Sequence, residues 1–434
     1  MTTGGIFRPV THDLDAIVLG GGPAGSCASS YLARAGHRVL LLEKEKFPRF
    51  HIGESLLPYN HEILSELGVI PQLKSAGFPI KRGAQFHLGN GSKGTGFVFR
   101  NGRFTKHTEA FQVERARFDE ILLRHASTLG VDVREEHEVE QVTATENGVA
   151  VTARSGGIAS EFRARFIIDA TGRGNLTGNQ EGIKELNPSL RKLAVFGHFE
   201  NVRLDSDHKG GDTVIVRLEN KWFWLIPLNL GAEGVPSKVS VGLVMDRDEF
   251  TASGQKPEEV FRHWVQQSPP VRDRLEKAQS VSPIQVTSDF SYRNRTFWSN
   301  RVLRVGDAAG FIDPIFSSGV FLAMFSGKLG AEAVGTALKN GNNGANEFAG
   351  FERRVRAALK IYSEMVENFY TTPFMELFLE PRAKWDLAAA VNAILAGELE
   401  GGWRLRWRMW LFFRLVRLQA RFPLVPRISF ARPT

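Results

Sequence analysis

Short apolar runs on either side of a helical pattern are the first regular feature of the chain. Residues 15–19 (Asp-Ala-Ile-Val-Leu) predict a buried strand, residues 26–35 predict a helix, and residues 38–42 predict a second strand. A strand, a helix and a strand in this order form a parallel pair with the helix packed against it. We therefore predict an α/β architecture with a parallel sheet for this part of the chain.

The middle of the chain has a different pattern, in which apolar and polar residues alternate. Residues 213–217 and 238–244 are examples, and a period of two predicts strands of a second sheet. The turn-rich segment 341–344 (Gly-Asn-Asn-Gly) follows, and residues 345–434 read mainly as helices. The chain therefore predicts an α/β unit, a second sheet and a helical C-terminal region.

A glycine-rich turn joins the first predicted strand to the helix. Gly20, Gly22 and Gly25 have the GxGxxG spacing, with Ala24 inside it. Such glycines permit a tight turn, bring backbone N–H groups close to a pyrophosphate, and let the helix pack against the strand. Glu43 ends the second predicted strand 18 residues beyond Gly25, near the position of the carboxylate that binds a ribose. Together these features predict a dinucleotide-binding unit.

Two later strands end in turns of a particular kind. Residues 166–172 end in Ala-Thr-Gly, and residues 302–310 end in Gly-Asp-Ala-Ala-Gly. In this order the segments resemble flavoproteins of the hydroxybenzoate hydroxylase fold, which implies FAD rather than NAD. The resemblance implies that Asp307 binds the ribityl hydroxyls. Further implied cofactor contacts are Arg115 at the start of a helix, the backbone of Val139, and Gly310.

Three more segments narrow the chemistry. Trp222 and Trp224 lie in a WxWxIP segment, and in an extended chain they point to the same face. Residues 311–319 fit the pattern FxxPxxSxG, and Lys81 follows the Gly-Glu-Ser segment 53–55. In this combination the sequence resembles the flavin-dependent halogenases.

The resemblance implies a role for each segment. The two tryptophans form a wall that keeps an organic substrate away from the flavin. The backbone N–H groups of Ser318 and Gly319, at a helix start, bind the halide. Lys81 captures hypohalous acid, which requires surroundings that depress its pKa and supply the neutral amine. Phe316 stands where the tryptophan halogenases have a glutamate, so we expect a phenol or pyrrole ring rather than free tryptophan.

The reaction implied by the resemblance halogenates an electron-rich aromatic ring with reduced FAD, oxygen, and chloride or bromide. No second GxGxxG unit is evident, and the resemblance implies a separate flavin reductase that supplies FADH2. The substrate is either a free aromatic molecule or one tethered to an acyl or peptidyl carrier protein. No metal site is predicted, and His51 is left without a role.

Two other functions stay open. The same fold hosts FAD-dependent aromatic monooxygenases and reductases, in which the WxWxIP segment would be only packing. A function of another class is a non-catalytic flavoprotein that binds an acidic partner.

The positive charge of the chain is concentrated at its C-terminal end. The net charge is +8, and residues 403–434 contain eight arginines but no lysine, aspartate or glutamate. As a helix, this segment has an apolar face at Leu405, Met409, Phe412, Phe413, Val416 and Ala420. The helix either docks on the core with its tryptophans stacked on arginines, or offers a basic surface to an acidic carrier protein or, less favourably, to a membrane. Nucleic acid is not an expected partner.

The organisation along the chain is interleaved. We predict an FAD-binding domain from residues 1–68, 111–174 and 300–339, a substrate-sheet domain from residues 69–110 and 175–299, and a helical region from residues 345–434. With 42% hydrophobic and 24% charged residues, the composition is that of a globular enzyme. No signal peptide or long uncharged apolar run is evident, so we expect a cytoplasmic location. The one cysteine, Cys27, excludes an internal disulfide and reads as a small buried residue.

Overall fold

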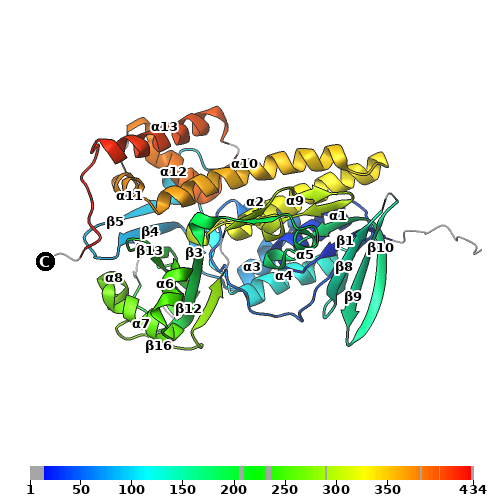
Figure 1. The fold of residues 1–434 in the computed structure, drawn as a ribbon, viewed down its shortest axis with the longest axis horizontal. Helices are drawn as coiled ribbons and strands as arrows, with labels where there is room; N and C mark the ends of the chain where they lie inside the picture. The colour runs from blue at the N-terminus through cyan, green and yellow to red at the C-terminus, as the bar shows by residue number, and fades with distance from the viewer. Residues whose placement is uncertain are drawn as a thin grey trace, which may run out of the picture.

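Two β-sheets and a layer of helices make up the protein in a computed structural model (Figure 1). The structure describes residues 14–145, 147–204, 210–230, 236–288, 291–381, 384–399 and 401–431. The α/β architecture, the second sheet and the helical C-terminal region are all present, as the sequence predicts. The division into domains by residue number stays a prediction.

The first sheet contains the N-terminal strand–helix–strand unit. Its parallel strands lie in the order β20 (Val302–Arg304), β10 (Ile158–Asp169), β1 (Leu14–Leu19), β2 (Val39–Leu42) and β7 (Asp132–Arg134). β19 (Trp298–Ser299) pairs with β20, and β8 (Glu138–Ala144) and β9 (Val149–Ser155) extend β10 as an antiparallel ribbon. Helices α1 (Pro23–Arg34), α4 (Arg115–Thr128) and α9 (Gly319–Asn340) pack with this sheet through a shared apolar core.

The second sheet carries the tryptophan segment in its middle. Its order is β16 (Gln279–Ser280), β12 (Lys192–Glu200), β15 (Pro236–Asp246), β14 (Trp222–Leu230), β13 (Thr213–Arg217), β4 (Gly83–Leu88) and β5 (Gly94–Val98), with β17 (Gln285–Ser288) also paired to β12. Phe223 and Leu225 face one core, to which α7 (Pro257–Gln267) contributes, and Trp222 and Trp224 face another. The alternation of a strand thus turns both tryptophans to one side.

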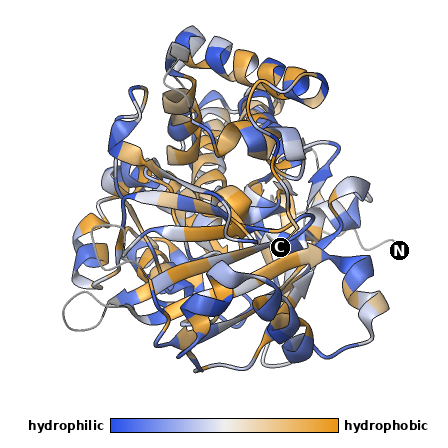
Figure 2. Cartoon of the chain, turned by 90° about the vertical axis from the view of Figure 1, so that its left-hand side faces the viewer, coloured by the Kyte–Doolittle hydropathy of each residue, from blue (hydrophilic) through white to orange (hydrophobic). Residues whose placement is uncertain are grey.

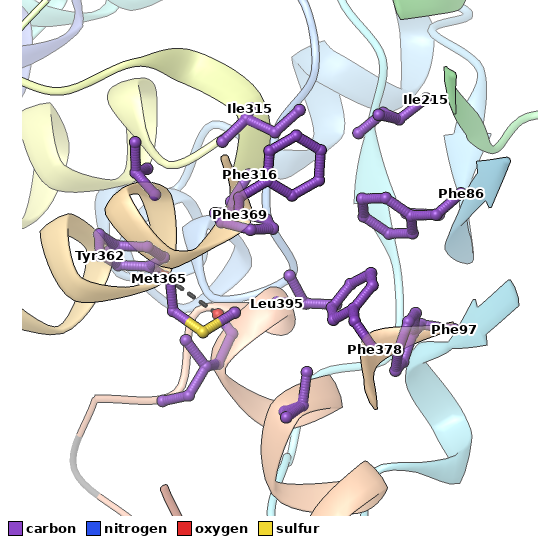
Figure 3. Close-up of a cluster of buried hydrophobic side chains, with 14 of the residues drawn as sticks. Phe86, Phe97, Ile215, Ile315, Phe316, Tyr362, Met365, Phe369, Phe378 and Leu395 are labelled. Carbon is purple, nitrogen blue, oxygen red and sulfur yellow. Dashed lines mark hydrogen bonds between the residues drawn. The ribbon is translucent and has the colours of Figure 1, made fainter. Parts of the chain in front are cut away.

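Four helices near the C-terminus of the chain cover the face of the second sheet that carries Trp222 and Trp224. They are α10 (Ala345–Phe369), α11 (Thr372–Phe378), α12 (Leu387–Ala396) and α13 (Gly402–Arg421). Between them and the sheet lies a core rich in aromatic residues, in which Phe86 and Phe97 of the sheet contact Phe378 of α11 (Figure 3). In Figure 1, α10 runs beside α9, so the helical layer spans both sheets.

Helix α13 docks on this core by the face that the sequence predicts, with one exception. Leu405, Met409, Phe412, Phe413 and Val416 are buried, and arginines stack on Trp403, Trp407 and Trp410. Ala420 is exposed, so its predicted burial is wrong. Gln419 is buried instead, because its side-chain oxygen accepts hydrogen bonds from the N–H groups of Leu424 and Val425 where the chain turns back. In Figure 2 the uppermost helix, α13, alternates hydrophilic and hydrophobic turns.

Short elements connect these layers. They are α2 (Asn60–Leu67), α3 (Ile70–Ser75), β3 (Ile80–Lys81), β6 (Ala110–Phe111), α5 (Leu176–Gln180), β11 (Lys184–Leu186), α6 (Arg247–Ser253), α8 (Pro269–Leu275), β18 (Tyr292–Asn294) and β21 (Gly310–Phe311), with short 3₁₀ turns between them. Within the described ranges, no helix is long and apolar enough to cross a bilayer.

Candidate active site

A cavity of about 400 Å³ lies between the two sheets. On one side it is bordered by the residues that follow β1, β2, β10 and β20, all at the carboxyl ends of parallel strands. Ligands in open α/β sheets bind at this edge, because helix N-termini and turn backbones meet there. On the other side the cavity is bordered by Ile215, Trp222 and Trp224 of the second sheet. The site therefore joins the dinucleotide unit to the tryptophan segment.

The glycine loop at one end of the cavity requires glycine for steric reasons. Gly20 has a φ of +98°, and a Cβ on Gly25 would lie 1.9 Å from the carbonyl oxygen of Gly20. Gly20, Gly22 and Ala24 line the cavity, whereas Gly25 lies behind them and lets α1 approach the loop. The structure thus shows a steric reason for glycine at Gly20 and Gly25, and the approach of Gly22 to a pyrophosphate stays a prediction.

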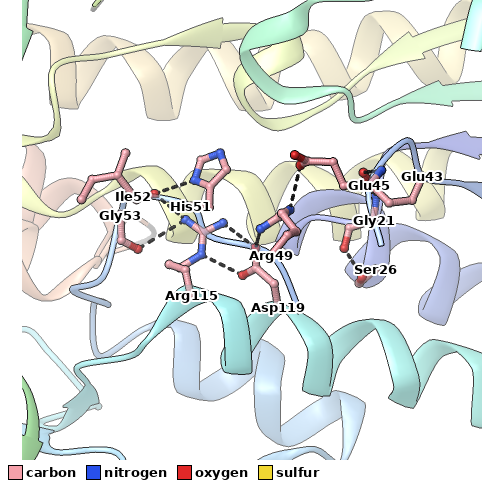
Figure 4. Close-up of polar contacts among 10 residues, drawn as sticks. All are labelled: Gly21, Ser26, Glu43, Glu45, Arg49, His51, Ile52, Gly53, Arg115 and Asp119. Carbon is pink, nitrogen blue, oxygen red and sulfur yellow. Dashed lines mark hydrogen bonds and ion pairs between the residues drawn. The ribbon is translucent and has the colours of Figure 1, made fainter. Parts of the chain in front are cut away.

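Glu43 is buried at the end of β2 and lines the same part of the cavity. Its Oε2 accepts a hydrogen bond from the N–H of Gly21 at 2.6 Å, and its Oε1 accepts one from the N–H of Glu45 at 2.8 Å (Figure 4). The carboxylate therefore fixes the glycine loop relative to β2. Val139, the other residue predicted near the adenosine end, also lines the cavity.

A buried arginine forms the floor near the middle of the cavity. Nε and Nη2 of Arg115 donate to the two carboxylate oxygens of Asp119 at 2.7 and 2.8 Å, and Arg49 donates to the same carboxylate at 2.7 Å (Figure 4). Burial works against the charge of Arg115, but the ion pair with Asp119 raises its pKa. His51 lies beside this cluster, and burial together with the charge of Arg115 lowers its pKa to about 3. His51 is therefore neutral and a poor base at neutral pH.

Two residues with carboxyl groups, Glu54 and Asp307, belong to the lining of the cavity. Asp307 lines it after β20, and burial raises its pKa to about 6 against the opposing effect of Arg173 and Arg115. Glu54 is buried, with Oε1 paired to Nε2 of His198 at 2.8 Å, while Oε2 has no hydrogen-bond partner in the described structure. A buried acceptor without a donor is costly unless a ligand supplies one.

These observations together fit FAD. The elongated lining runs from Glu43 and Val139, past the glycine loop with its steric need for glycine, and past Asp307 to the second sheet. Predicted cofactor residues Gly20, Gly22, Ala24, Glu43, Arg115, Val139 and Asp307 all line the cavity. Gly25 supports it from behind, and Gly310 borders a smaller neighbouring cavity.

Trp222 and Trp224 close the far end of the cavity as adjacent rings. Their centroids are 5.8 Å apart, and each indole N–H is held, that of Trp222 by the hydroxyl of Tyr370 and that of Trp224 by the hydroxyl of Ser240. Gly242 on β15 makes room for this arrangement, because a Cβ there would lie 2.1 Å from the ring of Trp224. Hydrogen bonds to both indoles and close packing of Trp224 on Gly242 thus fix the orientation of the two rings.

The segment before α9 forms a tight loop beside Asp307. Ser317 has a left-handed backbone with a φ of 57°, and Ser318 is the N-cap of α9. Ser318 and Gly319 border a small cavity of about 10 Å³ that Asp307 and Gly310 also border. The first N–H groups of a helix have no partner within the helix and point along its axis. Phe316 is buried and packs edge-on against Phe369 at 5.6 Å (Figure 3).

Lys81 is fully buried on β3, one hydrogen bond behind the cavity wall. Its Nζ donates to the hydroxyl of Ser55 at 2.9 Å and to the carbonyl of Leu56 at 3.2 Å. Ser55 lines the cavity and also hydrogen-bonds Thr213 at 2.9 Å. Burial lowers the pKa of Lys81 to about 7, against the opposing charge of Asp212. A large fraction of this amine is therefore neutral at physiological pH.

The site contains polar residues that the sequence patterns did not single out. Glu54 and His198 form a buried pair at the wall, and Tyr370 holds Trp222 from a helix far along the chain. Glu54 belongs to the Gly-Glu-Ser segment used to locate Lys81, so the sequence pattern could have singled it out as a site residue. His198 and Tyr370 carry no motif, and only the packing of their elements brings them to the site.

Comparison with known families identifies the class of protein. The family model described as FAD binding domain matches residues 13–336, which cover the glycine loop, Lys81, the tryptophans and the start of α9. The protein is therefore an FAD-dependent enzyme, in agreement with the cavity.

Relatives of known function narrow the class further. The chain is 32% identical to the 1H-pyrrole-2-carbonyl-[peptidyl-carrier protein] chlorinase of Pseudomonas fluorescens, with 91% of each chain covered. It is 29% identical to the corresponding brominase of Pseudoalteromonas luteoviolacea, over 83% of this chain and 86% of the other. The solved structure of the flavin-dependent brominase Bmp2 superposes with a TM-score of 0.83 at 26% identity, covering 94% of this chain and 99% of that one. The chain belongs to the flavin-dependent halogenases, which are oxidoreductases that use FAD, oxygen and a halide.

Proposed function

We propose that this enzyme halogenates an electron-rich, pyrrole-like aromatic ring carried by a peptidyl carrier protein, with hypohalous acid captured at Lys81. The single observation that carries the proposal is the buried amine of Lys81, whose hydrogen bonds are to the neutral oxygens of Ser55 and Leu56. When bound, reduced FAD would activate oxygen, which is the oxidant for the halide, and a separate flavin reductase would supply the reduced FAD. We also propose a cytoplasmic location.

Lys81 has the environment that capture of hypohalous acid requires. The neutral amine is the nucleophile, and burial lowers its pKa to about 7. Ser55 fixes the direction of the amine, and the ring of Phe99 lies 5.6 Å from Nζ. Ser55 is the link between Lys81 and the cavity wall, so the amine would be reached from the side of Ser55.

The small cavity at Ser318 and Gly319 supports the assignment of the halide site. A volume of about 10 Å³ is at the lower limit for one water molecule, so a chloride or bromide ion, which is larger, would require a small widening of this cavity. The start of α9 directs partial positive charge at this position. Asp307 borders the same cavity; its pKa is raised to about 6, so it is still mostly ionised at pH 7, and the start of α9 must outweigh its repulsion of an anion.

The tryptophan wall supports the separation of the two reaction sites. Trp222 and Trp224 line the FAD cavity on one side and contact the aromatic core of the C-terminal helices on the other. Hydrogen bonds hold both indole N–H groups, which supports a role of the two rings in keeping a bulky substrate away from the cofactor.

The carrier-borne substrate is supported by the two relatives that act on pyrrole-2-carbonyl groups bound to a peptidyl carrier protein. The exposed arginines of α13, among them Arg414, Arg417 and Arg421, give this chain a basic surface beside the aromatic core. Carrier proteins are typically acidic, and such complementarity raises the rate and specificity of docking.

The test is a reconstituted reaction with FAD, a flavin reductase, NADH, oxygen and bromide. The substrates are pyrrole-2-carbonyl on a peptidyl carrier protein and, separately, free pyrrole-2-carboxylate and a phenol, with products identified by mass spectrometry. We expect bromination of the carrier-bound ring by wild type, and oxygen consumption without bromination by Lys81→Ala. A hydroxylated product would instead indicate a monooxygenase, and bromination of the free phenol alone would contradict the carrier-borne substrate.

The docking surface is tested by reversing charge on α13. The triple variant Arg414→Glu, Arg417→Glu, Arg421→Glu should raise the KM for the carrier-bound substrate by about tenfold at low salt, with less effect at high salt because exposed charges are screened. The matched control is the triple variant Lys339→Glu, Arg353→Glu, Lys360→Glu at exposed positions of α9 and α10, which makes the same change in charge and should leave KM unchanged. Equal effects of the two would exclude α13 as the docking surface.

A further inference from the structure

Tyr370 connects the tryptophan wall to the loop before α9. Its hydroxyl accepts the indole N–H of Trp222 at 2.9 Å and donates to Oδ2 of Asp313 at 2.7 Å. Trp222 lies on β14, Asp313 lies in the FxxPxxSxG segment, and Tyr370 directly follows α10. One hydroxyl thus joins three segments that are far apart in the sequence.

Both partners of this hydroxyl are buried. Trp222 is 2% exposed, Asp313 is 0% exposed, and an indole has a single hydrogen-bond donor. A buried donor or acceptor that loses its partner carries the full cost of its desolvation. Without the hydroxyl, the indole and the carboxyl would each have to move to find another partner.

Asp313 in turn shapes the loop that leads to Ser318 and Gly319. Its Oδ1 accepts the N–H of Ile315 at 3.2 Å, which caps the short 3₁₀ turn Pro314–Phe316. Its own N–H donates to the hydroxyl of Ser291 at 3.1 Å. A shift of the Asp313 carboxyl would therefore move the turn Pro314–Phe316, which ends two residues before Ser318, the N-cap of α9.

The residue before Tyr370 contacts the same loop. The ring of Phe369 packs edge-on against Phe316 with centroids 5.6 Å apart, as Figure 3 shows. The ring of Tyr370 itself lies under two cations, Nζ of Lys192 at 4.3 Å and the guanidinium of Arg217 at 5.4 Å. These contacts fix the end of α10, so that the hydroxyl is presented at a constant position.

We infer that Tyr370 is a positioning residue. It sets the position of residues 313–318, the loop that leads to the proposed halide site, relative to the wall formed by Trp222 and Trp224. The inference rests on the proposed function of Ser318 and Gly319 as the halide site. Through Asp313, Tyr370 aligns these amides, and through Trp222 it keeps the wall closed. A hydroxyl from the C-terminal helical region thereby controls the efficiency of halide oxidation without touching halide, cofactor or substrate.

The test compares Tyr370→Phe with Tyr362→Phe in the FAD-loaded enzyme. Tyr362, within α10, is a matched control, because its hydroxyl is also buried but donates to the carbonyl of Ile394. In Tyr370→Phe, we expect the KM for bromide to rise about tenfold, a change equivalent to about 1.4 kcal/mol. The fraction of consumed oxygen that appears as brominated product should fall, while the rate of oxygen consumption and the affinity for FAD stay unchanged.

Two further measurements separate this role from a general loss of structure. Calorimetric titration of bromide into the FAD-loaded protein requires no turnover and should show about tenfold weaker binding for Tyr370→Phe. Trp222→Phe removes the same hydrogen bond from its other end and should lower product yield per oxygen, with little additional loss in the double variant.

The outcomes distinguish the two levels of the proposal. Wild-type enzyme that binds bromide but forms no brominated product would contradict the proposed function and leave the bromide titration as the test of Tyr370. Wild-type bromination with an unchanged bromide KM and product yield in Tyr370→Phe would overturn the inference. Equal losses in Tyr370→Phe and Tyr362→Phe would also overturn it. If Tyr370→Phe does not fold, a wild-type product yield in the Trp222→Phe variant would overturn the inference.

Discussion

Replacement of Lys81 by methionine should stabilise the protein while it abolishes halogenation. The folded protein holds this amine at a pKa of about 7, against 10.5 in a solvated lysine. At about 1.4 kcal/mol per pK unit, this difference opposes folding by about 5 kcal/mol at pH values well below 7. Methionine has a similar volume and no charge, but it loses the hydrogen bonds to Ser55 and Leu56, worth about 1 kcal/mol each. We therefore expect Lys81→Met to be about 2 kcal/mol more stable at pH 7.

The sign of the pH dependence follows from the protons bound in each state. Between pH 7 and 10.5 the unfolded chain keeps a proton on Lys81 that the folded protein has lost, so the stability of wild type rises with pH in this window. The variant lacks this contribution. Its advantage over wild type should therefore shrink by about 2 kcal/mol between pH 7 and pH 9. Urea unfolding at pH 7, 8 and 9, followed by tryptophan fluorescence with saturating FAD, measures this difference.

A second buried lysine provides the control. Lys192 is buried but donates to Asp246 at 2.7 Å, so Lys192→Met should destabilise the protein by leaving that carboxylate without its cation. An advantage of Lys81→Met over wild type that stays constant between pH 7 and 9 would refute the reasoning. It would mean that Lys81 remains charged in the folded protein and is not a source of neutral amine.

Three other consequences of the geometry can be measured. Gly25→Ala should abolish FAD binding, measured by fluorescence titration, because its Cβ would lie 1.9 Å from the carbonyl oxygen of Gly20; retained binding would show that the loop can relax. Glu43→Gln should weaken FAD binding by about tenfold in the same titration, since the neutral amide is a poorer acceptor for the N–H of Gly21. The yield of brominated product per oxygen should rise from pH 6 to 8 with a midpoint near the pKa of about 7 of Lys81, and a flat profile would contradict a neutral amine.

The dinucleotide unit was predictable from the sequence because its determinants are local. The strand, the glycine loop, the helix and the acid at the end of the second strand occur within one short stretch, and each has a steric or hydrogen-bonding reason for its residue type. The period-two alternation likewise predicted that Trp222 and Trp224 share a face, and the structure confirms it. The apolar face of α13 was predicted except at Ala420, where the turn after the helix recruits Gln419 instead.

The sequence by itself determined the class of fold, the FAD site and the residues of the halogenase motifs, because these depend on spacing along the chain. Only the tertiary structure decided the environment of those residues. The pKa of Lys81 is depressed because other elements bury its amine. The indole of Trp222 is hydrogen-bonded to Tyr370, which directly follows α10 in the C-terminal region. The pairing of Glu54 with His198 likewise requires two elements to meet. Desolvation and hydrogen bonding between distant segments are properties of packing, and no local pattern encodes them.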